Sequence, residues 1–241
     1  MKKTIKVQEV KSNAQNRRSF LKISGLAIAG TGLFLAGCSD DDDPINPPSG
    51  QVFDLGSGDL GILNYAYALE QLEADFYDRV VNANNFGSTF NSEEQQILVD
   101  IYNHEVVHRE FFKAAITGAA PNQNQVLPML DFEYSGFNFS DRMMVLQTAK
   151  TLEDTGVAAY NGAGRYITTP DYLVIAGKIV SVEARHAAAI RDLLNPGSAS
   201  FAGDDIIDPN GLDDAKKPSQ IISEVSALGI IQTPFTANSL A

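Results

Sequence analysis

The chain has 241 residues, enough for one domain with a sizeable core, and 44% of them are apolar, an ordinary share for a globular protein. Its formal net charge of −12 argues against nucleic acid and anionic lipid headgroups as partners. Cys38 is the only cysteine, which excludes an intramolecular disulfide.

Residues 1–37 have the pattern of an export signal. Arg17 and Arg18 precede an apolar run, Ile23–Ala36, that is too short for a comfortable membrane span. The arginine pair resembles a twin-arginine signal, and Leu35-Ala36-Gly37-Cys38 resembles the processing box of a bacterial lipoprotein. Cleavage before the cysteine would remove seven basic residues and leave 11 basic and 29 acidic ones. We therefore expect an exported and strongly acidic mature chain.

A lipidated tether is expected over residues 38–58. Cys38 would carry the lipid, and the segment after it begins with Asp40–Asp43 and is rich in proline, serine and glycine. Such a segment has too few apolar residues to build a core. The lipid would be the chain's only contact with a membrane. The predicted location is the bacterial cell envelope, on its periplasmic side or at the cell surface.

Four amphipathic helices follow the tether, because apolar residues recur there at three- and four-residue steps. Each is about 24 residues long, or roughly 36 Å at about 1.5 Å per residue. Their expected ranges are 59–83, 92–117, 140 or 141–163, and 170–195. Equal lengths and an all-α pattern predict a four-helix bundle over residues 59–195.

Capping residues mark where three of these helices begin. Ser57 or Asp59 can cap the first, and Ser92 with Gln95 fits a capping box at the second. The fourth has Thr169 as its expected cap, directly before a proline at the first helical position.

The connections predict how the helices are ordered. The first two helices, and the last two, are joined by short segments, which favours antiparallel neighbours. The connection between the second and third is long, and residues 121–139 are expected to cross the length of the bundle. Pro128, Phe132, Phe137 and Phe139 are the expected anchors of this crossover. Residues 196–241 form a C-terminal extension, in which 218–228 can form a short fifth helix.

Carboxylates and imidazoles recur in an ordered pattern on the four helices. A Glu-x-x-His unit, whose two side chains share one helix face, occurs at Glu105–His108 and again at Glu183–His186. Single glutamates on the other two helices, Glu70 and Glu153, complete an internal repeat. All four glutamates lie near mid-helix, so an antiparallel bundle brings them to one depth. Four carboxylates in an apolar core repel one another unless protons or cations neutralise them, which favours a pair of metal ions.

The segments Leu69–Tyr77 and Leu152–Tyr160 resemble the ferritin-like domain family, in particular its bacterial ferritin-like and desiccation-related group. The resemblance implies a ferritin-like four-helix bundle. Because sites of this kind leave coordination positions open to an oxidant, the redox alternative is an oxidoreductase that oxidises ferrous iron with dioxygen or reduces peroxide. The resemblance also implies two metal ions, iron or manganese, with zinc remaining an option. In the implied ligand set one ion is held by Glu70, Glu105 and His108, the other by Glu153, Glu183 and His186, and Glu105 and Glu183 are candidate bridges.

Several residues around this ligand set have open roles. His104 and Val182 stand where many di-iron relatives have an acidic residue that orients a ligand histidine. Glu73 lies nearly on the same face as Glu70 and competes with it as a ligand. Core packing is the favoured role for Tyr77 and Tyr160, and a hydrogen bond to a ligand is the alternative. The candidate neighbours of the ligands are therefore Glu73, Tyr77, His104 and Tyr160.

Two other functions fit parts of the sequence. His104-Glu105-Val106-Val107-His108 matches the His-Glu-x-x-His motif of zinc metalloproteases, but that function leaves the second Glu-x-x-His unexplained. The other alternative is a non-catalytic stress protein of the cell envelope whose metal site is structural or vestigial. Metal-dependent stability without turnover would distinguish it from an enzyme.

Overall fold

The computed structural model describes residues 52–240. The expected export signal, the lipidation site at Cys38 and most of the tether therefore lie outside the described residues. Within residues 52–240, no helix combines the length and apolar character needed to cross a bilayer.

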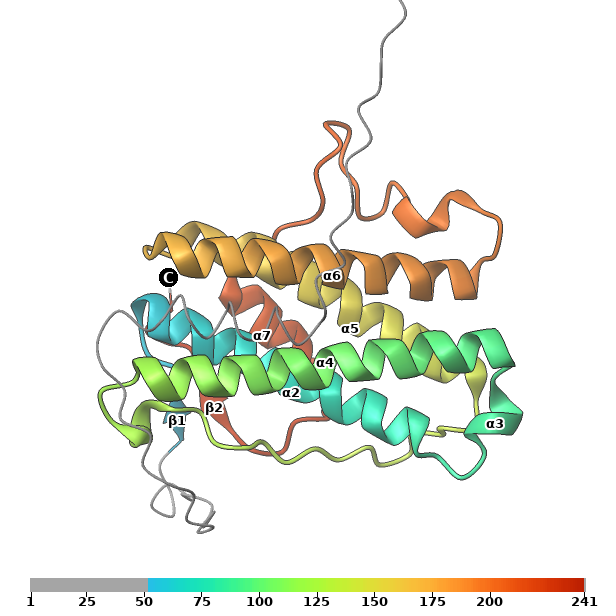
Figure 1. Ribbon diagram of the computed structural model, residues 1–241, viewed down its shortest axis with the longest axis horizontal. Coiled ribbons are helices and arrows are strands. Elements are labelled where there is room, and N and C mark those ends of the chain that lie inside the picture. Colours follow the sequence, from blue (N-terminus) through green and yellow to red (C-terminus); the bar gives the residue numbers. More distant parts are fainter. Residues whose placement is uncertain (1–51, 241) are drawn as a thin grey trace, which may run out of the picture. The chain divides into compact units, whose positions relative to one another are not determined.

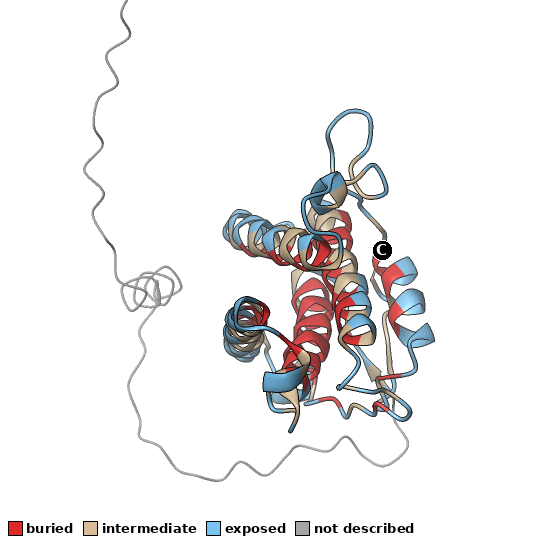
Figure 2. Ribbon diagram, turned by 90° about the vertical axis from the view of Figure 1, so that its right-hand side faces the viewer, coloured by how far each residue is buried: buried red, intermediate tan, exposed pale blue. Residues whose placement is uncertain are grey.

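Four long helices form the body of the protein, which confirms the all-α bundle. They are α2 (Gly58–Val81), α4 (Ser92–Ala119), α5 (Arg142–Ala163) and α6 (Pro170–Leu194). In Figure 1, α2 runs opposite to α4, and α5 runs opposite to α6. The α2 helix packs along α4, and α5 packs along α6. Their buried faces meet along the centre of the bundle, as Figure 2 shows in red.

Shorter elements lie before, between and after these helices. The helical ones are α3 (Phe86–Thr89), η1 (Gln123–Gln125), η2 (Gly164–Tyr166), η3 (Ala199–Ala202) and α7 (Pro218–Ala227). The strands are β1 (Phe53–Asp54) and β2 (Phe235–Thr236). The α7 helix is the short C-terminal helix that the sequence predicts.

The long crossover exists because α4 and α5 run in the same direction, so the chain must return along the bundle between them (Figure 1). Two buried amide side chains on α2 hold it in place. Asn64 accepts a hydrogen bond from the backbone of Leu127 at 2.9 Å, and Gln71 accepts one from Leu130 at 2.8 Å. These bonds satisfy backbone groups that would otherwise be buried without partners.

Aromatic side chains also fasten the crossover. The Phe76 ring on α2 lies 5.9 Å from the ring of Phe137 and 6.3 Å from that of Phe139, measured between centroids. Pro128 contributes its carbonyl, which accepts from the Gln71 amide at 3.2 Å. Phe132 is only partly buried and packs at the edge of the core.

The start of α4 differs from the expectation by one residue. Asn91, not Ser92, is the N-cap: its side chain accepts from the backbone of Glu93 and of Glu94 at 2.9 and 3.0 Å. The Glu94 carboxylate accepts in turn from the Asn91 backbone, which completes a capping box. Asn91 with Glu94 fits the same three-residue spacing as Ser92 with Gln95, and the sequence pattern alone does not separate them.

Asp59 connects the beginnings of two helices. Ser57 occupies the N-cap position of α2 without a side-chain hydrogen bond. The Asp59 carboxylate instead accepts from the backbone of Thr168 at 2.7 Å and of Thr169 at 2.9 Å, just before α6. Thr169 is the N-cap residue of α6 as expected, although its side chain makes no capping bond. An acidic side chain from α2 thus holds the backbone that leads into α6, while no side-chain capping bond forms at Thr169.

The folded part begins earlier than the expected end of the tether at residue 58. Strands β1 and β2 pair in parallel, with Phe53 opposite Phe235. Leu55 is fully buried in the core. Residues 53–57 are therefore part of the fold, and the prediction of a tether through residue 58 is wrong there, because the partner strand lies in the distant C-terminal extension.

The C-terminal extension packs closely on α5. The backbone of Lys216 donates to the carbonyl of Ala158 at 3.0 Å. A Cβ atom on Gly162 would lie 1.7 Å from the Lys216 carbonyl oxygen, so only glycine permits this approach.

Candidate metal centre

Six buried side chains from the four long helices converge at mid-bundle. Each helix supplies its ligand-type residues near its midpoint, and antiparallel packing brings the midpoints to one level. Two groups of ligand-type atoms form there, each with all atoms within 4.8 Å of one another. The first group is Glu70, Glu105, His108 and Glu183, and the second is Glu105, Glu153, Glu183 and His186.

Each imidazole faces the carboxylate of the other Glu-x-x-His unit. His108 Nδ1 lies 2.8 Å from Glu183 Oε1, and His186 Nδ1 lies 2.8 Å from Glu105 Oε1. The two histidine rings are 6.3 Å apart between centroids. Glu105 and Glu183 therefore lie between the two groups and belong to both.

The inward-facing atoms of the six residues contact one another as ion pairs but make no hydrogen bond of good geometry. Eight of their oxygen and nitrogen atoms are buried without a hydrogen-bond partner among the described residues, including both oxygens of Glu105 and of Glu183 and the Nδ1 atoms of both histidines. Buried polar atoms normally have partners, and a cluster of acceptors that lacks them fits a cation. Carboxylate oxygen and imidazole nitrogen are donors that suit iron or manganese. This buried cluster could hold metal ions.

Proton affinities in the cluster show the mutual repulsion of its carboxylates. Burial, and then repulsion from Glu183, raises the pKa of Glu105 to about 8. Burial also opposes ionisation of Glu183, but its contacts with His108 and His186 prevail and lower its pKa to about 2. Burial works to lower the pKa of each histidine, and the carboxylates around them raise it above its usual value. Without metal, the cluster must share protons to remain buried.

Two tyrosines form hydrogen bonds with the outer carboxylates, Glu70 and Glu153, which each belong to only one of the two groups. The Tyr77 hydroxyl on α2 donates to Glu153 Oε1 on α5 at 2.6 Å. The Tyr160 hydroxyl on α5 donates to Glu70 Oε1 on α2. Burial, followed by the charge of the carboxylate, raises the pKa of both tyrosines well above its usual value, so both remain donors. Core packing is therefore not their whole role, and the alternative of a hydrogen bond to a ligand-type residue is what the structure shows.

Glu73 lies beside the cluster but outside both groups, which favours Glu70 over Glu73 as the ligand on α2. Burial, and then the charges of Glu105 and Glu183, raises the pKa of Glu73 well above its usual value. Its Oε1 atom lies 3.0 Å from where a Cβ of Gly156 would be. In the internal repeat Gly156 is equivalent to Glu73, since each follows its helix's glutamate by three residues. The sequence carries a signal for Gly156 that the ligand pattern does not use: aligning the two repeats places this glycine opposite Glu73.

His104 contacts a histidine of the cluster from outside. Its Nδ1 atom lies 3.0 Å from His186 Nε2, on the side of the ring opposite the carboxylates. The residue directly before Glu105 is thus a histidine whose ring contacts that of His186. His104 belongs to neither group of ligand-type atoms, whereas a His-Glu-x-x-His zinc site requires His104 and His108 on one ion. The zinc protease alternative does not fit this arrangement.

Comparison with known families agrees with the geometry. A family model for the ferritin-like domain matches residues 58–196, which is more than half of the chain and spans α2 to α6. No curated protein matches the sequence.

Proposed function

Because the chain belongs to the ferritin-like domain family, we propose that it holds two metal ions, iron or manganese, and uses them in a reaction with dioxygen or peroxide. The observation that carries this proposal is the set of eight buried donor atoms without hydrogen bonds at mid-bundle. Four carboxylates that face only two imidazoles are costly in an apolar core unless cations neutralise the remaining charge.

Each ion has its own set of ligands in this proposal. Glu70, Glu105 and His108 hold the first, and Glu153, Glu183 and His186 hold the second. Glu105 and Glu183 would contribute to holding both ions, which is supported by their presence in both groups of converging atoms. Either metal would supply redox chemistry and leave coordination positions open to an oxidant.

The surrounding residues would prepare the site for this chemistry. Tyr77 and Tyr160 orient the outer carboxylates through their hydrogen bonds. Burial of all four glutamates excludes bulk water from the ligands. Burial and the neighbouring carboxylates raise the pKa of Glu73, which places a further carboxyl group next to the cluster.

Metal titration of the full-length chain tests the proposal. We expect two ferrous or manganous ions per chain, and an added stability of about 2.7 kcal/mol at a hundredfold ligand excess over the dissociation constant. Replacing both Glu105 and Glu183 by Gln keeps the shape of the side chains and should lower metal affinity, while the metal-free bundle stays as stable or gains stability. Replacing the exposed Glu93 and Glu110 of α4 by Gln is the matched control.

Turnover decides between the two functional alternatives. Metal-dependent consumption of dioxygen or peroxide by the parent, and its loss in the Glu105→Gln, Glu183→Gln variant, would support an enzyme. Metal-dependent stability without consumption would instead favour the non-catalytic stress protein. Equal destabilisation of the double variant with and without metal would show that the carboxylates are structural, and the proposal would be wrong.

We also propose that the protein is exported and lipid-anchored, on the basis of Arg17, Arg18 and the Leu35-Ala36-Gly37-Cys38 box. Replacing Cys38 by Ser should release it from membranes, and replacing both arginines by lysine should block export. Retention of the Cys38→Ser protein in the envelope fraction after salt and carbonate washing would contradict the lipid anchor.

A further inference from the structure

The outer side of the His186 ring is held by another histidine. Its Nε2 atom, the ring nitrogen that does not face the carboxylates, lies 3.0 Å from His104 Nδ1. The two ring planes are 8° apart, and the ring centroids are 5.2 Å apart. That separation is close to the distance between the nitrogens plus the radii of both rings, so the rings meet edge to edge. The hydrogen bond therefore lies in the ring planes, where the N–H bond and the nitrogen lone pair point.

The His108 ring has no such partner. Its outer nitrogen, Nε2, makes no hydrogen bond with any of residues 52–240 and is not one of the buried atoms that lack a partner, so it is open to solvent. The side chain of His108 is 11% exposed, against 5% for that of His186. In the internal repeat the residue equivalent to His104 is Val182, which has no polar side-chain atom. The repeat therefore orients only one of the two histidines.

The carboxylates around the two proposed ion positions are matched. The Tyr77 hydroxyl donates to Glu153. The Tyr160 hydroxyl donates to Glu70 in the same way, and the remaining two carboxylates belong to both groups. Glu73 also breaks the repeat, but it belongs to neither group. The nearest difference between the two ligand sets is therefore the partner of the histidine.

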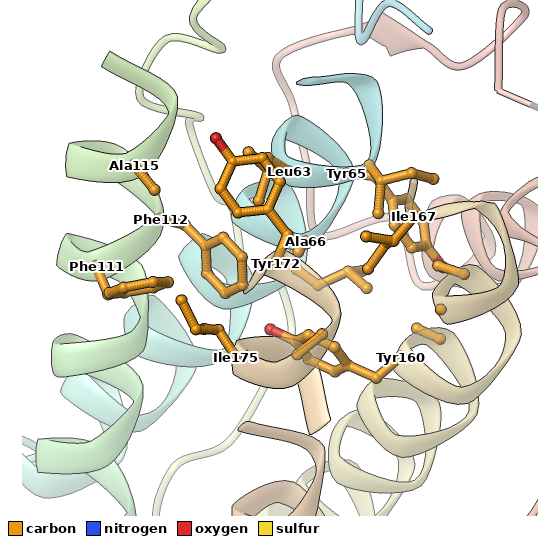
Figure 3. Close-up of a pocket in the computed structure, with 16 residues that line it drawn as sticks. Leu63, Tyr65, Ala66, Phe111, Phe112, Ala115, Tyr160, Ile167, Tyr172 and Ile175 are labelled. Carbon is orange, nitrogen blue, oxygen red and sulfur yellow. The ribbon is translucent and has the colours of Figure 1, made fainter. Parts of the chain in front are cut away.

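The packing around the two tyrosines differs in the same sense. Tyr160, the donor beside the first ion position, is 9% exposed and lines an apolar cavity together with Phe112 and Ile175. Figure 3 shows these three side chains around the space between the helices. Tyr77, the donor beside the second position, is 0% exposed, and its ring packs 5.3 Å from that of Phe76, measured between centroids. The first position is thus the less tightly enclosed of the two.

We propose that His104 positions His186 and thereby makes the two ion positions unequal. The second position, with His186, binds its ion more tightly, and the first, with His108, exchanges its ion more readily. The inference rests on the proposed function and ranks its two positions. A metal ligand must have Nδ1 free of a proton, so Nε2 carries the proton and donates it to His104. This bond fixes the ring and its tautomer before an ion arrives, whereas the outer nitrogen of His108 faces mobile solvent.

The hydrogen bond can be tested without metal. In NMR spectra of the metal-free, full-length chain, the Nε2 proton of His186 should exchange slowly with solvent and that of His108 rapidly. His104→Phe keeps a ring but accepts no hydrogen bond, so the slow proton should be lost. His104→Asn offers an acceptor oxygen near the position of Nδ1 and should restore it. Asn103→Ala is the matched control, because Asn103 is exposed and adjacent on the same helix.

Manganous ion then ranks the two positions. Calorimetric titration of the parent should show two binding steps that differ in affinity by about 10- to 100-fold. Anomalous diffraction from crystals with one equivalent of manganous ion should place it beside His186. His104→Phe should weaken the tighter step to about the level of the weaker one. The His104→Asn and Asn103→Ala variants should keep the two steps apart.

The outcomes separate this inference from the proposed function. Equal affinities in the parent, or first occupancy beside His108, would overturn the inference. Unchanged steps in the His104→Phe variant would show that another feature, such as Glu73, makes the positions unequal, and the role of His104 would be wrong. A parent that binds no manganous ion would contradict the proposed function, while the slow proton of His186 would still show whether His104 positions the ring.

Discussion

Tyr77 on α2 and Glu153 on α5 are joined by a hydrogen bond of 2.6 Å that crosses from one half of the internal repeat to the other. Tyr160 and Glu70 make the reciprocal bond in the opposite direction. Each half of the repeat therefore orients a carboxylate of the other half, and the two outer carboxylates of the cluster depend on both halves.

Replacing Tyr77 or Tyr160 by Phe removes one of these donors. We expect metal affinity to fall about 10- to 100-fold in either variant, the usual effect of losing a residue that orients a ligand. The two losses should be similar, since the positions are equivalent in the repeat. Calorimetric titration with manganous ion measures the change.

Tyr102→Phe is the control for these variants. The Tyr102 hydroxyl also donates to a carboxylate, Asp78 Oδ1 at 2.9 Å, but away from the cluster. The Tyr102→Phe variant should leave metal affinity unchanged. If all three tyrosine variants weaken binding alike, the effect comes from general loosening of the bundle and not from orientation of Glu70 and Glu153.

The metal-free protein should lose stability as the pH rises from about 5 to about 8. The raised pKa values of Glu105, His108 and His186 mean that the folded state binds more protons than the unfolded state in this window, so stability falls with pH. Glu183, whose pKa is lowered to about 2, has the opposite effect, but only below the ordinary glutamate value of 4.5. Urea unfolding at several pH values measures the slope, and stability that rises towards pH 8 without metal would contradict it.

Replacing Glu73 by Gln should stabilise the metal-free protein at pH 8 more than at pH 5. Glu73 has a raised pKa, so at higher pH it must either ionise in the core or keep a proton that the unfolded chain has released. Glutamine has nearly the same shape and no proton to lose. Urea unfolding of both proteins at the two pH values tests this, and an equal change at both would show that the raised pKa has no effect on stability.

Replacing Gly162 by Ala should destabilise the protein by about 3 kcal/mol, the upper end of the usual cost of overpacking, because the new methyl group meets the Lys216 backbone. Gly177→Ala on α6 is the control: nothing lies within 4 Å of its Cβ position, and alanine should gain about 0.5–1 kcal/mol in a helix. Thermal unfolding compares the two. An unchanged Gly162→Ala protein would mean that the C-terminal extension does not pack on α5.

The bundle could be predicted because its signals are local. Apolar periodicity, the start of α5 at Asp141 and the spacing of Glu105 and His108 all follow from helix geometry within one segment. The common level of the four glutamates along the bundle axis follows from the equal helix lengths, because each glutamate lies near the middle of its helix. These signals predict that side chains share one level, which the converging groups show.

Features that depend on distant partners could not be predicted in the same way. Leu55 is buried because β1 pairs with a strand near the other end of the described chain. The bond between Tyr77 and Glu153 requires knowing which helices lie side by side, and periodicity does not provide this. The choice of Asn91 over Ser92 depends on backbone angles that the two residues could each adopt.

Glu73 and Gly156 make the two halves of the bundle complementary and not interchangeable. The carboxylate of one occupies the space that a side chain at the other would need. A bundle made of two copies of the first half, which carries Glu73, would bring two Glu73 carboxylates into one space. A bundle made of two copies of the second half, which carries Gly156, would leave that space empty. A side chain at position 156 would meet the Glu73 carboxylate, so it requires that carboxylate to move or a smaller residue at position 73.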